Sequence, residues 1–233
     1  MLSISERICE VREKIASAAE KSGRRAEDIT FVAVTKTHEA DIINEAVDCG
    51  ITDIGENRAQ EIVRKYPDIK PVNWHLIGHL QTNKVKYIID KVKLIHSVDS
   101  IKLMDEINRL SEKADKITEV LIQINISGEE TKFGIKPEEL DMLLDHAGLC
   151  GSIRVSGLMT VAPKLDTGMS NRLHFANIYR IYIDNRSKKY DNVCMKYLSM
   201  GMSGDYEDAI CEGANLVRIG SAVFGQRDYT KTK

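Results

Sequence analysis

Short runs rich in β-branched residues alternate with helical stretches along this 233-residue chain. The first such run, FVAVT at residues 31–35, passes directly into an amphipathic helical pattern over 39–49. The alternation then repeats through the rest of the sequence, and no proline- or glycine-rich linker interrupts it. Strands separated by helices pair in parallel, so this pattern predicts an α/β protein.

The number of repeats narrows the architecture further. Strands are expected at 31–35, 52–55, 74–78, 93–98, 119–126, 154–160, 193–200 and 216–220. Helices are expected at 3–22, 39–49, 57–66, 81–91, 100–115, 137–147, 170–189 and 204–213. Open sheets and closed barrels both satisfy the alternation, but eight units in about 230 residues is the count and size of a (β/α)₈ barrel. We therefore expect one TIM-barrel domain over residues 1–233, with an extra helix at its N-terminus.

Charge and composition exclude several classes of function. The formal net charge is −2, so the chain has no global basic field to hold nucleic acid or an anionic membrane. No run approaches the ~18 apolar residues of a membrane span, and Glu6, Arg7 and Glu10 do not fit a signal peptide. Five scattered cysteines, never spaced CxxC, favour free thiols in a reducing compartment. The sequence predicts a cytoplasmic protein.

The first strand leads into a lysine, Lys36, where a core strand has no obvious need for a cation. Alternation places Val32, Val34 and Lys36 on one face of the strand, so the lysine can point into the mouth of a barrel. Partial desolvation there would lower the pKa of the ammonium and supply a neutral amine for a Schiff base. A solvated lysine, or a lysine paired with Glu56, is the alternative.

The last strand carries an arginine on its inner face. In LVRIGS, Val217 and Ile219 suit the helix-facing side, which leaves Arg218 inside the barrel. A guanidinium there keeps its charge and needs an acceptor. The acceptor is either a structural partner or the ring nitrogen of a cofactor such as pyridoxal phosphate (PLP).

Two loops rich in small residues follow the last two strands. They are SMGMSG at 199–204 and GSAVFG at 220–225, where barrels frequently bind phosphate. Ser203 is a suitable N-cap for the next helix, whose first N–H groups could bind an anion. A plain capped turn would explain Ser203 but not the second loop. Amine, arginine and phosphate loops together match the aldehyde, ring nitrogen and phosphate of PLP.

Several motifs give the chain a resemblance to a known family over nearly its full length. They are VAVTK (32–36), GENRAQE (55–61), WHLIGHLQTNK (74–84), GLMTVAP (157–163), SMGMSGDYEDAI (199–210) and VRIGSAVFGQR (217–227). With these motifs the chain resembles the pyridoxal-phosphate homeostasis proteins, which are similar to the N-terminal domain of alanine racemase. The resemblance implies an alanine-racemase-like barrel, the PLP fold type III barrel without its C-terminal β domain.

The resemblance also implies a role for each site residue. Lys36 would form the Schiff base with PLP, and Arg218 would face the pyridine nitrogen and disfavour its protonation. Asn57 and His79 would line the cofactor pocket. The phosphate would be bound by Ser199, Gly201, Met202, Ser203, Gly220 and Ser221, with Gly201 and Met202 contributing backbone N–H groups.

Three functions fit this site. The resemblance implies a monomeric protein that binds PLP and exchanges it with PLP-dependent apoenzymes, with no catalytic turnover. The alternative is a weak amino-acid racemase with His79 as second base, although racemases of this type use an additional domain and a tyrosine from a partner subunit. The third is a Schiff-base aldolase, which needs no arginine at a ring nitrogen.

His75 and Lys132 are two further residues whose type could indicate a functional role. His75 and His79 lie four residues apart on a strand, ~13 Å, which is too far for one metal ion. His75 is therefore expected to be a hydrogen-bonded core histidine. Lys132, in the loop after the fifth strand, is a candidate to receive departing PLP by transimination.

Overall fold

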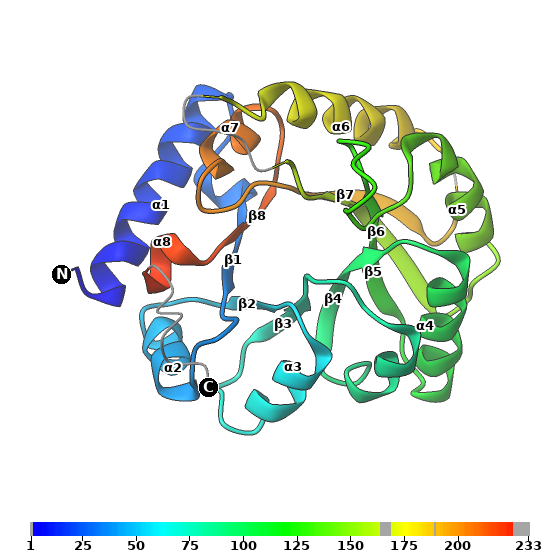
Figure 1. Ribbon diagram of the computed structural model, residues 1–233, viewed down its shortest axis with the longest axis horizontal. Helices are drawn as coiled ribbons and strands as arrows, with labels where there is room; N and C mark the ends of the chain where they lie inside the picture. The colour runs from blue at the N-terminus through cyan, green and yellow to red at the C-terminus, as the bar shows by residue number, and fades with distance from the viewer. Residues whose placement is uncertain (1, 164–168, 189, 226–233) are drawn as a thin grey trace.

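The computed structural model describes residues 2–163, 169–188 and 190–225, and it contains a closed barrel of eight parallel strands (Figure 1). The strands follow one another around the barrel in chain order. They are β1(Thr30–Val34), β2(Asp53–Glu56), β3(Asn73–Leu76), β4(Val92–Val98), β5(Thr118–Ile124), β6(Ile153–Thr160), β7(Val193–Ser199) and β8(Leu216–Ile219). β8 closes the barrel against β1, with Arg218 in register with Val32. The predicted fold class is confirmed.

Helices form the outer ring of the barrel (Figure 1). They are α1(Ile4–Lys21), α2(Ala40–Asp48), α3(Ala59–Lys65), α4(Ile101–Lys113), α5(Leu140–Ala147), α6(Arg172–Asn185), α7(Tyr206–Cys211) and α8(Ser221–Phe224), with 3₁₀ turns η1(Ala26–Asp28), η2(Thr82–Tyr87) and η3(Pro137–Glu139). The expected helix over 81–91 is instead the 3₁₀ helix η2. A 3₁₀ helix rises ~2.0 Å per residue against ~1.5 Å in an α-helix, so a short segment can return the chain to β4.

The added N-terminal helix takes a place in this ring. α1 begins with a capping box, in which the Ser3 hydroxyl accepts from the Glu6 N–H and the Glu6 carboxylate accepts from the Ser3 N–H. It buries Ile8, Val11 and Ile15, each burial stabilising the fold by about 1.5–3 kcal/mol. α1 packs against α7, α8 and α2 (Figure 1). Because α8 has only four residues, α1 covers the seam that a longer eighth helix would cover.

The interior is divided into two regions. A large apolar layer lies between the strands and the helices, and it includes Ala33, Ile54 and Leu76. A small second cluster fills part of the barrel lumen, with Val32, Leu94, Leu121, Met159 and Leu216 as its buried members. Strand alternation therefore directs even-numbered residues of β1 and β8 into the lumen, as predicted for Val32 and Arg218.

The cysteines and the helices agree with the composition. All five cysteines are free. No helix among the described residues is long and apolar enough to cross a membrane.

Candidate ligand site at the mouth of the barrel

Lys36 lies just beyond the C-terminal end of β1. The Thr35 N–H still donates to the Gly55 carbonyl at 3.0 Å, so the strand ladder extends to the residue before the lysine. Thr35 is buried on the helix-facing side, and alternation places half-buried Lys36 on the lumen side with Val32. Thr37 then has a φ of 71°, a strained value for a β-branched residue. This sharp turn keeps Lys36 at the mouth, where strain of this kind often accompanies function.

Glu56, the alternative partner of this lysine, binds two other donors. The Lys65 ammonium and the Thr35 hydroxyl each donate to Glu56 Oε1 at 2.7 Å, on the helix-facing side of the barrel. Lys65 Nζ also donates to the Thr35 carbonyl at 3.0 Å. The buried Lys65 thus shares Glu56 Oε1 with Thr35, and the alternative in which Glu56 pairs with Lys36 stays a prediction.

Arg218 lies in the lumen below the mouth, with 3% of its surface exposed. Its Nη1 donates to Ser199 Oγ at 2.5 Å, and its Nη2 donates to the Thr160 carbonyl at 2.8 Å. These bonds engage two of the five N–H groups of a guanidinium. Burial lowers the pKa of Arg218 to about 10, against the opposing charge of Asp205, so the side chain stays cationic at neutral pH.

Ser203 joins the two small-residue loops. Its hydroxyl accepts from the Gly220 N–H at 3.1 Å and from the Ala222 N–H at 3.4 Å. α7 begins only at Tyr206 and has Asp205 as its N-cap residue, so the prediction that Ser203 caps this helix is wrong. The Ser203 hydroxyl thus joins the loop after β7 to the loop after β8 by side chain–backbone hydrogen bonds.

Backbone groups of these loops are suited to an anion. Among the described residues, the N–H groups of Ser203, Gly204 and Ser221 meet no hydrogen-bond acceptor. A Cβ on Gly204 would meet no heavy atom within 4 Å, so open space lies beside this turn. Gly201 has a φ of 90°, and a Cβ there would lie 2.6 Å from the Ala209 Cβ. The donor set and the space fit a phosphate group.

Two predicted phosphate ligands have other partners in this structure. The Met202 N–H donates to Asp205 Oδ1 at 2.7 Å, so it is not available to an anion. Ser199 is fully buried, and its hydroxyl contacts both Arg218 and His96 Nδ1, the latter at 3.0 Å. The contact of Ser199 with phosphate stays a prediction, and in this structure the hydroxyl lies inside the lumen against Arg218.

The opposite side of the mouth is formed by loops after β2, β3 and β5. His79 Nδ1 lies 3.4 Å from Asp99 Oδ2, and the imidazole stacks on Phe133 with ring centroids 3.9 Å apart. Burial raises the pKa of Asp99, although His79 opposes this shift. A Cβ on Gly78 would lie 2.3 Å from the Asn57 carbonyl oxygen, so only glycine lets these two loops meet. Asn57 and His79 thus both border the mouth, and Phe133 was not predicted.

Lys132 also belongs to this side of the mouth. It precedes Phe133 in the loop after β5, and its Nζ lies 2.8 Å from Glu129 Oε1. Its proposed part in the release of a cofactor stays a prediction.

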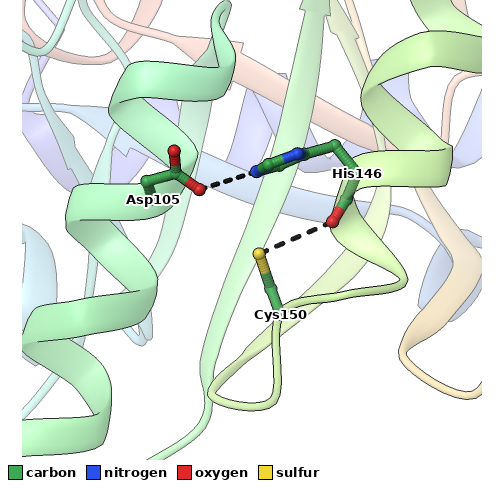
Figure 2. Close-up of side chains that lie close together, drawn as sticks. All are labelled: Asp105, His146 and Cys150. Carbon is green, nitrogen blue, oxygen red and sulfur yellow. Dashed lines mark hydrogen bonds and ion pairs between the residues drawn. The ribbon is translucent and has the colours of Figure 1, made fainter.

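A second cluster of donor atoms lies on the outer ring, away from the mouth. Asp105 of α4, His146 of α5 and Cys150 place their donor atoms within 4.8 Å of one another (Figure 2). His146 Nε2 and Asp105 Oδ1 are 2.6 Å apart, and the Cys150 thiol donates to the His146 carbonyl. Burial raises the pKa of the Cys150 thiol, which disfavours the thiolate that a metal requires. We interpret the cluster as a histidine–carboxylate hydrogen bond beside a protonated thiol.

Comparison with known proteins places this barrel in a class. A family model described as "Alanine racemase, N-terminal domain" matches residues 11–228. Alanine racemase of Clostridium difficile 630 is 17% identical with a TM-score of 0.72, and the match covers 92% of this chain and 58% of that one. At this identity the likeness concerns the fold alone. Fold and mouth together define a barrel of the alanine racemase N-terminal type.

Sequence relatives and a solved structure narrow the class to one family. The pyridoxal phosphate homeostasis proteins of Aquifex aeolicus and Escherichia coli K12 are 42% and 36% identical to this chain, over 98% and 99% of its length and 100% of theirs. PipY of Synechococcus elongatus PCC7942, with PLP bound, is 29% identical with a TM-score of 0.82, over 96% of this chain and 100% of that one. The chain belongs to the pyridoxal phosphate homeostasis protein family. Its relatives are named as homeostasis proteins and not as enzymes.

Proposed function

We propose that this protein binds PLP through a Schiff base on Lys36 and exchanges it with PLP-dependent apoenzymes, as a monomeric carrier in the cytoplasm. The observation that carries the proposal is the arrangement of one amine, one buried cation and one anion site on adjacent strands. β1 pairs with β8, and a Cβ on Gly220 would lie 3.3 Å from the Val34 Cβ. The amine of Lys36 and the loop around Gly220 therefore belong to one seam.

The distance between Lys36 and Arg218 along the strand direction supports the same proposal. Arg218 is in register with Val32, four residues before Lys36, which corresponds to ~13 Å of strand rise. The lysine side chain spans part of this distance, and the rest leaves room for a planar ring between amine and guanidinium. When bound, PLP supplies an aldehyde that condenses with a primary amine and releases water. The Ser203, Gly204 and Ser221 N–H groups would hold the phosphate.

Arg218 would limit what the bound cofactor does. A guanidinium only donates hydrogen bonds, so beside the ring nitrogen it disfavours protonation there. An unprotonated ring is a weaker electron sink than one paired with a carboxylate. This argument, together with the names of the relatives, supports a carrier without catalytic turnover.

The test is reduction of the PLP-loaded protein with borohydride, followed by mass mapping of the modified lysine. We expect a yellow protein that bleaches on reduction and carries the adduct on Lys36. Lys36→Ala should lose the visible band completely while retaining its thermal midpoint and circular dichroism. Lys14→Ala, an exposed lysine on α1, is the matched control and should remain yellow. An adduct on another lysine would refute the proposal.

A further inference from the structure

A line of buried polar side chains crosses the barrel lumen below the proposed cofactor site. Asp53 Oδ1 lies 2.9 Å from His75 Nε2, and His75 Nδ1 lies 2.9 Å from His96 Nε2. His96 Nδ1 lies 3.0 Å from Ser199 Oγ, which accepts from Arg218 Nη1 at 2.5 Å. The five residues come from β2, β3, β4, β7 and β8, and each is at most 7% exposed.

The direction of every hydrogen bond in this line follows from its two ends. The Asp53 carboxylate only accepts, so a neutral His75 carries its proton on Nε2 and accepts at Nδ1 from the Nε2–H of His96. A neutral His96 then accepts at Nδ1 from the Ser199 hydroxyl. Arg218 only donates, so Ser199 Oγ also accepts from its Nη1.

The charge states agree with this order. Burial lowers the pKa of His75 despite the opposing charge of Asp53. Burial, with the adjacent His75 and the charge of Arg218, holds the pKa of His96 well below its usual value. Other charged groups near the line are Lys93, 3.4 Å from Asp53, together with Glu119 and Asp205. Two neutral imidazoles thus connect a carboxylate to a guanidinium.

The line cannot act as a proton wire to the mouth. A proton passed along the line towards Arg218 would stop at Ser199, because the guanidinium already carries all its N–H protons and has no lone pair to accept another. What the fixed order does is hold the Ser199 hydroxyl with its lone pairs towards Arg218. Ser199 Oγ and the Thr160 carbonyl then accept from Nη1 and Nη2 of Arg218 and fix the orientation of the guanidinium plane.

We propose that His75 and His96 are positioning residues, which act through Ser199 to fix Arg218 where it faces the ring nitrogen of the cofactor. The cofactor side of this inference rests on the proposed function, whereas the hydrogen-bond order is a property of the protein alone. Breaking the line frees the guanidinium to turn away, and protonation of the ring nitrogen then becomes easier.

The first test needs no cofactor. Nitrogen-15 NMR of the imidazoles in the apo protein should show His75 and His96 as neutral Nε2–H tautomers, and both should remain neutral below the usual histidine pKa of about 6.5. An Nδ1–H tautomer at either residue, or ordinary titration of either one, would overturn the proposal.

The second test uses variants that cut the line at known points. His96→Asn offers Ser199 an acceptor but loses the hydrogen bond to His75. His96→Gln keeps the donor to His75 but loses the hydrogen bond from Ser199. Ser199→Ala removes the hydrogen bond between the line and Arg218. Ser97→Ala is the matched control, because this neighbour is equally buried but donates to the Gly78 carbonyl outside the line.

The readout is the ring nitrogen of ¹⁵N-labelled PLP, followed against pH. His96→Gln and Ser199→Ala should raise the midpoint of its protonation by about one pH unit, a tenfold effect, and Ser97→Ala should not. Midpoints equal to wild type, with the Lys36 adduct still formed, would overturn this inference alone. Wild type without a Lys36 adduct would overturn the proposed function. If a variant fails to fold, the NMR test on the wild-type apo protein decides the proposal.

Discussion

Two groups of buried charges each take a carboxylate from β2 and lie on opposite sides of the barrel wall. Outside the lumen, Lys65 and Thr35 both donate to Glu56 Oε1 and form a compact cluster, in which Glu56 Oε2 has no hydrogen-bond partner among the described residues. Inside, the line from Asp53 to Arg218 keeps its two charges at opposite ends. The outer cluster has its opposite charges in direct contact, whereas the inner line ends in a cation that faces the mouth. We infer that the outer cluster serves stability and the inner line serves the site.

Removing the outer lysine should give the largest loss of stability. Lys65→Met leaves the Glu56 carboxylate buried without its cation, which costs about 3–5 kcal/mol of unfolding free energy. Urea unfolding measures this loss. The double variant Lys65→Met with Glu56→Gln should recover most of it, because the uncompensated charge is gone and Thr35 keeps an acceptor.

The same variant separates the two groups of charges. Lys65→Met should leave the protonation midpoint of the PLP ring nitrogen unchanged. A loss of unfolding free energy below about 1 kcal/mol, or a changed protonation midpoint of the ring nitrogen, would contradict the distinction between the outer cluster and the inner line.

Acid should act first on the inner line. The pKa values of His75 and His96 are lowered in the folded state, so below the usual value of 6.5 the unfolded chain binds protons that the folded chain refuses. Stability is therefore full above this pH and falls as the pH is lowered, by up to ~1.4 kcal/mol per pH unit for each histidine. His96→Gln should reduce the slope by about half. An unfolding free energy that does not change with pH below 6.5 would contradict the assignment of His75 and His96 as neutral.

Asp53 adds a second loss at lower pH. Burial raises its pKa, but hydrogen bonds from His75 and Thr52 outweigh this effect and lower the pKa from 3.8 to about 2. The stabilisation is present above the unfolded pKa and is lost as the pH falls through about 2. Unfolding midpoints of Asp53→Asn across this range test the assignment, since the variant should lack this second loss.

The smallest effect is expected at the mouth, outside both groups of charges. Ser203→Ala removes the acceptor shared by the Gly220 and Ala222 N–H groups and loosens the two loops against each other. PLP should bind more weakly by about 1 kcal/mol or more, close to fivefold in Kd. Equilibrium dialysis measures this change, with the exposed Ser187→Ala as control. Unchanged affinity would show that the link between the loops does not hold the phosphate.

The sequence predicted the wall of this barrel better than its lumen. Alternating strands and helices determine the outer apolar layer, and the same alternation correctly assigned Arg218 to the lumen. The rise of a strand, which separates His75 from His79 by ~13 Å, correctly predicted that His75 is a hydrogen-bonded core histidine. These predictions succeed because strand periodicity is local.

Contacts across the lumen were not predictable in this way. His96 and Ser199 are 103 residues apart, and no pattern within either strand states that their side chains meet. Ser203 was misassigned for a related reason, since a serine before a helix satisfies the N-cap pattern whether or not a neighbouring loop takes its hydroxyl. The 3₁₀ turn η2 was missed because Val85, Ile88 and Ile89 have α-helical spacing.

The seam between β1 and β8 joins residues that are synthesised at different times. Lys36 is synthesised more than 180 residues before Arg218 and Gly220. A nascent chain on the ribosome therefore presents this lysine long before the groups that would hold the rest of the ligand. On the proposed function, PLP binding would wait until the last strand emerges and α1 folds over the junction.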